Sequence, residues 1–209
     1  GSEEQKAKGI EDNEEKFLNE MLEVGKHQND PELVKAMIKS GRVAFDFVTK
    51  ELGYKPDNLT AVSGMSVPRA HHFVPSKLIE TLYNHVKKCG VPVLFNTPAE
   101  RLVWDTEKGC IAGVRAKTKD GKTIFVEAKK GVLLATGGFT RNPKLLAKFN
   151  PLMMKTEPEG GIGNTGDGML MAQAYGADTL DTQYIKATFG YRPDAKKYNT
   201  DTLHGYYDG

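Results

Sequence analysis

The chain has 209 residues, of which 39% are hydrophobic and 27% are charged, a balance typical of a folded globular protein and not of a disordered one. Its 29 Lys and Arg residues nearly balance its 27 Asp and Glu residues, so the formal net charge is only +2. This charge argues against nucleic acid or an anionic membrane as a partner, and no apolar run approaches the ~18 residues of a membrane-spanning helix.

Helical spacing of apolar residues dominates the first 55 or so residues. Apolar side chains recur at helical intervals over 17–22, 33–38 and 43–48, which predicts three short helices. Asp30 followed by Pro31 predicts the N-cap and the first position of the second helix. We expect residues 1–62 to form a helical arm without a cluster of reactive groups.

The pattern changes from Ser63 onward. Ser76 is the expected N-cap of a helix with an apolar face over 78–86, and "VPVLF" (91–95) is an expected short buried strand. The runs "ERLVWD", "CIAGVRAKT" and "KTIFVEA" are separated by turn residues at 107–109 and at 120–121. Three strands joined in this way predict an antiparallel meander.

An unalternating apolar run, "GVLLA" (131–135), follows the meander, as expected of a strand buried on both faces of a parallel sheet. It ends in the small residues Ala135, Thr136, Gly137 and Gly138, none of which can do chemistry by itself. Small residues after a buried strand suggest that a ligand approaches the backbone there. Asn142–Pro143 predicts the start of the next helix.

A formal GxGxxG stands at residues 161–166, and Asp181 lies about where a ribose-binding carboxylate would be expected. A dinucleotide-binding turn needs a strand directly before the first glycine, and the preceding "PLMMKTEPEG" has two prolines and no strand period. We therefore reject that interpretation. Asp167, which precedes a predicted helix, has two interpretations that the spacing does not separate: it accepts hydrogen bonds from sugar or alditol hydroxyls, or it caps the helix.

The two cysteines, Cys89 and Cys110, have no CxxC spacing. They predict free thiols, and neither a disulfide framework nor a metal site is expected. The redox compartment, cytoplasmic or periplasmic, stays open.

Three motifs in this order carry a resemblance: "ATGGF" at 135–139, "TGDG" at 165–168 and "DTQYI" at 181–185. The chain resembles the flavoprotein of the fumarate reductase/succinate dehydrogenase family, especially the soluble flavocytochrome-type fumarate reductases. The "SVPRAHHFVPSKLIETLYNHVKKCGVPVLFNT" stretch is similar to the family's segment before the meander. The resemblance spans nearly the whole chain.

The resemblance implies an α/β fold: part of an FAD-binding domain, with a parallel sheet, a three-stranded antiparallel meander and an N-terminal helical arm. It implies FAD as the cofactor, with Asp167 binding the ribityl region and Ala99 lying by the adenine. The residues that it assigns to the cofactor are Ala99, Ala135, Thr136, Gly137, Gly138, Thr165, Gly166 and Asp167.

The resemblance also divides the chain into a helical segment (1–62), the second half of an FAD-binding domain (63–185) and the start of a capping, substrate-binding domain (186–209). The family's opening βαβ unit, which holds the FAD pyrophosphate, has no counterpart before residue 63. The arginine that donates the proton in the family would lie beyond Gly209. We therefore expect an internal piece of a longer flavoprotein that binds FAD poorly and is inactive by itself.

One position departs from the family's pattern. Thr188 stands where the family has a histidine that contacts a substrate carboxylate, so fumarate as the substrate is in doubt. Arg192 and Tyr191 are the nearby residues most able to compensate. Of the adjacent histidines His71 and His72, only one could face a flavin, because neighbouring side chains of an extended segment point to opposite faces.

Arg69 has two interpretations, neutralisation of charge on the flavin or a structural ion pair. For the whole protein, three functions remain: a flavoenzyme that transfers hydride between FAD and an activated alkene, a non-catalytic fragment, and a flavoenzyme acting on a bulkier alkene such as a steroid or an aryl acrylate. The expected partners are a small-molecule substrate and, in the enzyme interpretations, an electron donor or acceptor protein.

Overall fold

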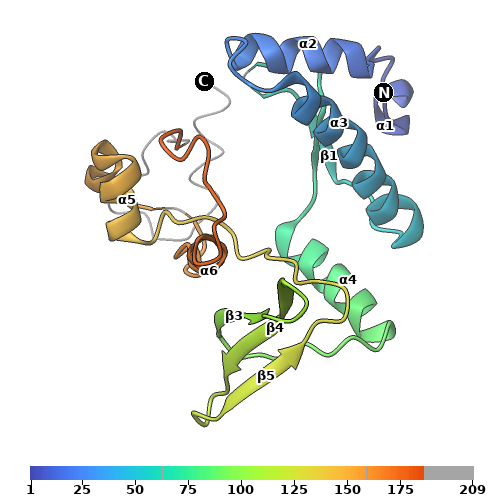
Figure 1. Ribbon diagram of the computed structural model, residues 1–209. Helices are drawn as coiled ribbons and strands as arrows, with labels where there is room; N and C mark the ends of the chain where they lie inside the picture. The colour runs from blue at the N-terminus through green and yellow to red at the C-terminus, as the bar shows by residue number, and fades with distance from the viewer. Residues whose placement is uncertain (63, 159, 186–209) are drawn as a thin grey trace. The chain divides into compact units, whose positions relative to one another are not determined.

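The computed structural model describes residues 1–62, 64–158 and 160–185 (Figure 1). The described chain forms two compact units, one of residues 1–93 and one that begins at Leu94. The predicted boundary after residue 62 refers to the domains of the family and stays a prediction. Each unit is described by itself below.

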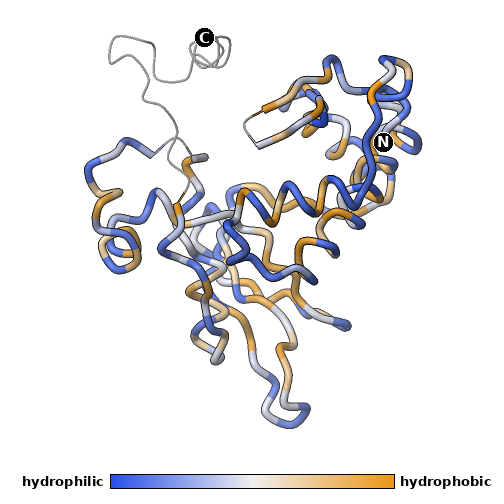
Figure 2. Tube along the Cα trace, turned by 90° about the horizontal axis from the view of Figure 1, so that it is seen from above, coloured by the Kyte–Doolittle hydropathy of each residue, from blue (hydrophilic) through white to orange (hydrophobic). Residues whose placement is uncertain are grey.

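The first unit begins with three helices, α1 (Glu3–Ala7), α2 (Glu14–Val24) and α3 (Pro31–Asp46). Asp30 caps α3 through its side chain and Pro31 occupies the first turn, which confirms the predicted start of this helix. Figure 2 shows apolar and polar residues alternating along the helical turns. Val34 and Ile38 supply the buried apolar positions of α3.

The predicted third helix is not separate from the second. A π-helical turn, η1 (Phe47–Glu51), continues α3 without a break. Residues 42–52 contain neither proline nor glycine, so nothing in the sequence interrupts the backbone hydrogen bonds. Gly53, with φ +71°, follows the turn, in agreement with the expected stop.

A small hairpin and a helix complete the first unit. Strands β1 (Asn58–Thr60) and β2 (Ala70–His72) pair antiparallel, with Leu59 opposite His71. Helix α4 (Pro75–Lys88) begins two residues earlier than Ser76 would allow as a cap, because its N-cap is Val74, which makes no side-chain capping bond. The expectation for Ser76 is therefore wrong, and the fixed φ of Pro75 at the first position sets the start of the helix instead.

The second unit contains the predicted meander. Strands β3 (Ala99–Asp105), β4 (Cys110–Lys117) and β5 (Thr123–Glu127) form an antiparallel sheet in the order β3–β4–β5, the green arrows of Figure 1. Leu102 and Ala116 bury their side chains, with about 5% of each residue exposed. The meander is confirmed as an antiparallel element between residues 99 and 127.

The two apolar runs on either side of the meander do not form strands. Residues 91–95 and 131–135 have no strand pairing, in contrast to the expectation. Leu133 is 90% exposed and Phe95 is 65% exposed. A strand exists only where a neighbour completes its hydrogen-bond ladder, and no described segment pairs with either run.

Two short helices, α5 (Pro143–Phe149) and α6 (Asp167–Gln173), follow, with a 3-10 turn, η2 (Pro151–Lys155), after α5. Asn142 caps α5 as predicted. No strand precedes the glycines of 161–166 among the described residues, which agrees with the rejection of a dinucleotide-binding turn there. The apolar side chains Leu145, Leu146 and Met171 are buried in this part of the unit.

Candidate functional site

Two segments that lie 30 residues apart meet at the predicted cofactor residues. The Gly168 N–H donates to Thr136 Oγ1 at 3.1 Å, and the Gly166 N–H donates to the Gly138 carbonyl at 3.0 Å. We call residues 135–138 and 164–168 the glycine clasp. The clasp brings together all but one of the residues that the resemblance assigns to FAD: Ala135, Thr136, Gly137, Gly138, Thr165, Gly166 and Asp167.

Three positions of the clasp require glycine, because nearby protein atoms leave no room for a side chain there. A Cβ on Gly137, which has φ +75°, would lie 2.5 Å from Asn164 Oδ1. A Cβ on Gly166, which has φ +80°, would lie 2.5 Å from Leu145 Cδ1, and one on Gly168 would collide with the threonine hydroxyl to which its own N–H donates. Packing and backbone conformation therefore explain these three glycines without a ligand.

Gly138 differs from its neighbours. Apart from its chain neighbours, no atom of the described residues lies within 4 Å of the position that its Cβ would take, and its φ is outside the left-handed region. Neither packing nor conformation therefore requires a glycine there. An open backbone position that follows the small, exposed residues 135–137 fits the close approach of a bulky planar group such as a flavin.

Asp167 is the first residue of α6, and Gly166 is the N-cap of that helix. No side-chain capping bond is present, so the capping interpretation of Asp167 is wrong. The Asp167 side chain is exposed, and its carboxylate accepts no hydrogen bond from the described residues. The other interpretation, that the carboxylate accepts hydrogen bonds from the hydroxyls of a sugar or alditol, stays a prediction.

Ala99 lies at the start of β3, opposite Ala116 on β4. Helix α6 packs against β3. The Tyr175 hydroxyl, just after α6, donates to the Leu102 carbonyl at 2.9 Å, and its ring stacks on Trp104 with centroids 5.9 Å apart. The meander and the clasp therefore belong to one packed structure.

Sequence reasoning missed the role of two residues, Arg141 and Asn142, that hold the clasp through three hydrogen bonds. The Arg141 N–H donates to the Asn164 carbonyl at 2.9 Å, and Arg141 Nε donates to the Gly160 carbonyl at 2.9 Å. Asn142 Nδ2 donates to the Thr165 carbonyl at 2.8 Å. Asn142 was recognisable as a helix start, but contacts across more than 20 residues have no local sequence signal.

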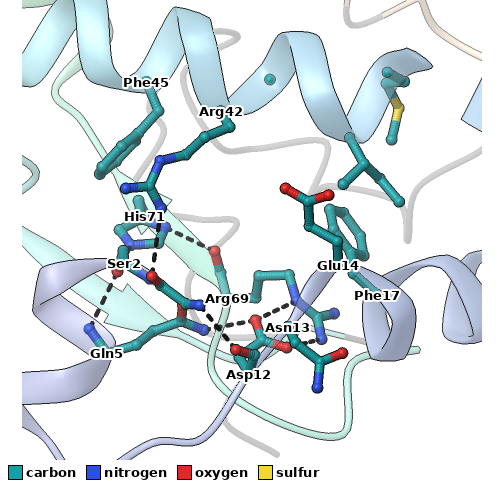
Figure 3. Close-up of a pocket in the computed structure, with 14 residues that line it drawn as sticks. Ser2, Gln5, Asp12, Asn13, Glu14, Phe17, Arg42, Phe45, Arg69 and His71 are labelled. Carbon is teal, nitrogen blue, oxygen red and sulfur yellow. Dashed lines mark hydrogen bonds and ion pairs between the residues drawn. The ribbon is translucent and has the colours of Figure 1, made fainter. Parts of the chain in front are cut away.

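Arg69 forms a structural ion pair in the first unit (Figure 3). Its guanidinium donates two hydrogen bonds to the Asp12 carboxylate, from Nε at 2.7 Å and from Nη2 at 2.6 Å. Nη1 donates a third to Glu20 at 2.8 Å. The guanidinium also lies 4.4 Å from the centre of the Phe17 ring. One cation between two carboxylates leaves a net negative charge, so the ion-pair interpretation of Arg69 holds and the flavin-neutralising one has no support.

The ion pairs shift the titration of all three groups. The Arg69 hydrogen bond lowers the pKa of the Asp12 carboxyl to about 2, against the opposing effect of burial. Hydrogen bonds from Arg69 and then Ser66 lower the pKa of Glu20 to about 2. The bond to Asp12 in turn raises the pKa of Arg69 further above its ordinary value. All three side chains are charged at neutral pH.

A pocket of about 400 Å³ adjoins this ion pair, between the N-terminal helices and β2 (Figure 3). Its apolar lining includes Phe17 and Phe45. His71 lies in its wall, with Nδ1 2.8 Å from the Arg69 carbonyl oxygen and Nε2 2.8 Å from Ser2 Oγ. His72 is exposed, so the two histidines face opposite sides of β2 as expected.

The predicted substrate residues Thr188 and Arg192 lie outside the described residues, and their roles stay predictions. Within residues 1–62, 64–158 and 160–185, no group of His, Cys, Asp and Glu side chains is arranged to hold a metal ion. In the same part of the chain, no helix is both long and apolar enough to cross a bilayer.

Comparison with known proteins relates the chain to fumarate and urocanate reductases. It is 28% identical over 210 residues to the probable fumarate reductase Ifc3 of Shewanella frigidimarina (strain NCIMB 400), covering 98% of this chain and 35% of that protein. It is 34% identical over 192 residues to the urocanate reductase of Eggerthella lenta, covering 87% of this chain and 31% of that protein. The chain therefore spans about a third of the length of these relatives.

Among solved structures, the open conformation of a flavocytochrome c3 fumarate reductase matches 98% of this chain and 37% of its own, with a TM-score of 0.86 and 29% identity. This match confirms the expected fold class, part of an FAD-binding domain with a small antiparallel sheet. The family model described as "FAD binding domain" matches residues 1–190. The chain therefore belongs to the FAD-binding domain family that includes the fumarate reductases, and FAD is the cofactor of that family.

Proposed function

We propose that this chain is part of an FAD-dependent oxidoreductase that transfers hydride between the flavin and an activated alkene. The observation that carries the proposal is that the clasp hydrogen bonds bring seven of the predicted FAD residues together, in a chain whose family is described as an FAD-binding domain. When bound, FAD supplies the redox chemistry, and the protein supplies binding and orientation.

The residues proposed to line the FAD site are those of the clasp together with Ala99. The exposed Asp167 carboxylate is proposed to accept hydrogen bonds from the ribityl hydroxyls, since no described protein group uses it. Because Gly138 has no side chain, the flavin can lie close to the backbone at this position. The clasp hydrogen bonds from Gly166 and Gly168 keep this surface in one conformation before the cofactor arrives.

The proposal on the substrate rests on the residue at position 188 and on the substrates for which the relatives are named. The relatives include proteins named for fumarate and for urocanate, which share an acrylate group but differ in bulk and charge. Thr188 cannot supply the cationic contact that a histidine gives to a second carboxylate. An acrylate without a second carboxylate is therefore the second candidate substrate class.

The experiment is a Gly138→Val variant of the full-length protein. We expect the purified variant to fold and to carry a small fraction of the wild-type flavin, measured from the absorbance ratio of flavin to protein. The matched control is Gly161→Val, because Gly161 is equally open and also has an ordinary φ, but lies outside the clasp.

A full flavin complement in Gly138→Val would overturn the assignment of the clasp to FAD. Equal flavin loss in both variants would also count against it, because the effect would then not be specific to the clasp.

A further inference from the structure

Asn142 uses both ends of its side-chain amide. Its Oδ1 accepts from the backbone N–H groups of Lys144 at 3.1 Å and Leu145 at 3.3 Å, which caps α5. Its Nδ2 donates to the Thr165 carbonyl at 2.8 Å. The cap explains why a small polar residue begins the helix, but it does not use the Nδ2 donor. That second bond ties the start of α5 to the glycine clasp.

The bond to Thr165 fixes one peptide plane from both sides. The carbonyl of the Thr165–Gly166 peptide is held by Asn142, and the N–H of the same peptide donates to the Gly138 carbonyl at 3.0 Å. In a trans peptide these two groups point in opposite directions, so two bonds leave the plane no freedom to rotate. Both partners come from the single short segment 138–142.

The fixed peptide determines where Asp167 points. Gly166 stands at φ +80° between this peptide and the first residue of α6. A glycine visits many conformations unless its neighbours restrict it. Release of the Thr165 carbonyl would therefore allow Gly166 to change φ and Asp167 to leave its position.

We propose that Asn142 is a positioning residue of the cofactor site, which locks the Thr165–Gly166 peptide so that Asp167 presents its carboxylate to the ligand hydroxyls. The inference rests on the proposed function, because it takes Asp167 as an FAD contact. Asn142 itself touches no cofactor atom in this proposal; it acts through the peptide that it holds.

The test is Asn142→Asp in the full-length protein. An aspartate keeps the oxygen that caps α5 and is as good an N-cap as asparagine. It replaces the Nδ2 donor with an oxygen that repels the Thr165 carbonyl. We expect the thermal unfolding midpoint of the apoprotein to fall modestly, because one internal hydrogen bond is lost, and the FAD dissociation constant to rise about five- to tenfold.

Asn150→Asp is the matched control. Asn150 Nδ2 likewise donates to a backbone carbonyl, that of Gln183 at 2.8 Å, but outside the clasp. The control should keep the wild-type FAD affinity. Asp167→Asn combined with Asn142→Asp should weaken binding by less than the product of the two single effects, because both changes act on the same contact.

The outcomes separate the two proposals. If Gly138→Val and Asp167→Asn both keep full FAD affinity, the assignment of the clasp to FAD fails. If these two variants lose FAD while Asn142→Asp binds it as tightly as wild type, the positioning role fails and the FAD site stands. Fully multiplicative effects in the double variant would also overturn the positioning role.

Discussion

At the scale of single residues, Arg69 is a buried cation that pairs with the two carboxylates of Asp12 and Glu20 and so stabilises the fold. The Arg69 and Asp12 side chains are 8% and 5% exposed, so removal of the arginine would leave two negative charges close together with little water. Breaking a buried pair by removing one partner typically costs about 3–5 kcal/mol. Arg69 thus links the N-terminal helices to β2 and contributes stability rather than charge for a cofactor.

From this ion pair we predict that the folding stability of the first unit falls in acid. The Asp12 pKa is lower in the folded chain, about 2, than its ordinary value of 3.8. The unfolded chain therefore binds more protons at acidic pH, so this stability is present above about pH 4 and is lost as the pH falls toward 2. After allowance for solvent screening, we expect Asp12 to contribute about 1 kcal/mol.

Asp12→Asn should remove that part of the pH dependence. The measurement is urea unfolding followed by far-UV circular dichroism between pH 6 and pH 2.5. Asp30→Asn is the control, because asparagine keeps the cap of α3 and leaves the Arg69 ion pair intact. An unchanged pH dependence in Asp12→Asn would contradict the prediction.

Thr188 carries the prediction on substrate. If it stands at the family's substrate histidine, the full-length protein should bind fumarate about ten- to hundredfold more weakly than a histidine-containing relative, since one charge-assisted hydrogen bond contributes about 1.5–3 kcal/mol. Thr188→His should gain fumarate reduction, measured as reduced-flavin oxidation by fumarate. Thr182→His, the same change nearby, should not.

Robust wild-type activity on fumarate would count against this prediction. It would mean that Arg192, or a residue beyond these 209, supplies the missing carboxylate contact; an arginine can bind a carboxylate with two parallel hydrogen bonds.

At the scale of elements, the packing of α6 against β3 joins the clasp to the meander. The Tyr175 hydroxyl donates to the Leu102 carbonyl and its ring stacks on Trp104. The two contacts are separable by mutation, because phenylalanine keeps the ring and loses only the hydroxyl.

Tyr175→Phe should destabilise the second unit by about 1 kcal/mol, the usual net contribution of one hydrogen bond. Tyr175→Ala should cost about 2 kcal/mol, because it also removes the half-exposed ring that stacks on Trp104. Trp104 is the only tryptophan of the chain, so its fluorescence during urea unfolding reports on this contact directly. Equal stability of Tyr175→Phe and wild type would show that the hydroxyl bond contributes nothing.

At the scale of the whole molecule, the FAD site proposed at the clasp is only part of what a dinucleotide needs for tight binding. The described residues contain no glycine-rich turn between a strand and a helix, the element that binds a pyrophosphate. We predict that the 209-residue chain alone binds FAD weakly, with a dissociation constant above the micromolar range in equilibrium dialysis. A sub-micromolar value would contradict this prediction and would show that the clasp and its surroundings suffice.

The sequence alone determined the local features of this protein. Turn residues and strand periods predicted the meander, and Asp30–Pro31 and Asn142–Pro143 predicted two helix starts, because caps and turns depend on neighbours within a few residues. The ordered motifs at 135–139, 165–168 and 181–185 indicated the family, which the comparisons confirm.

Only the tertiary structure decided how the glycines differ and what Arg69 does. Side chains from distant segments leave no room for a side chain at Gly137, Gly166 and Gly168, whereas the Cβ position of Gly138 is open. The apolar pattern at 91–95 and 131–135 predicted two strands, but neither run forms one. A strand also needs a hydrogen-bond partner from elsewhere in the fold, which a local pattern does not specify. Contacts between residues far apart in the chain depend on packing, and no local pattern encodes them.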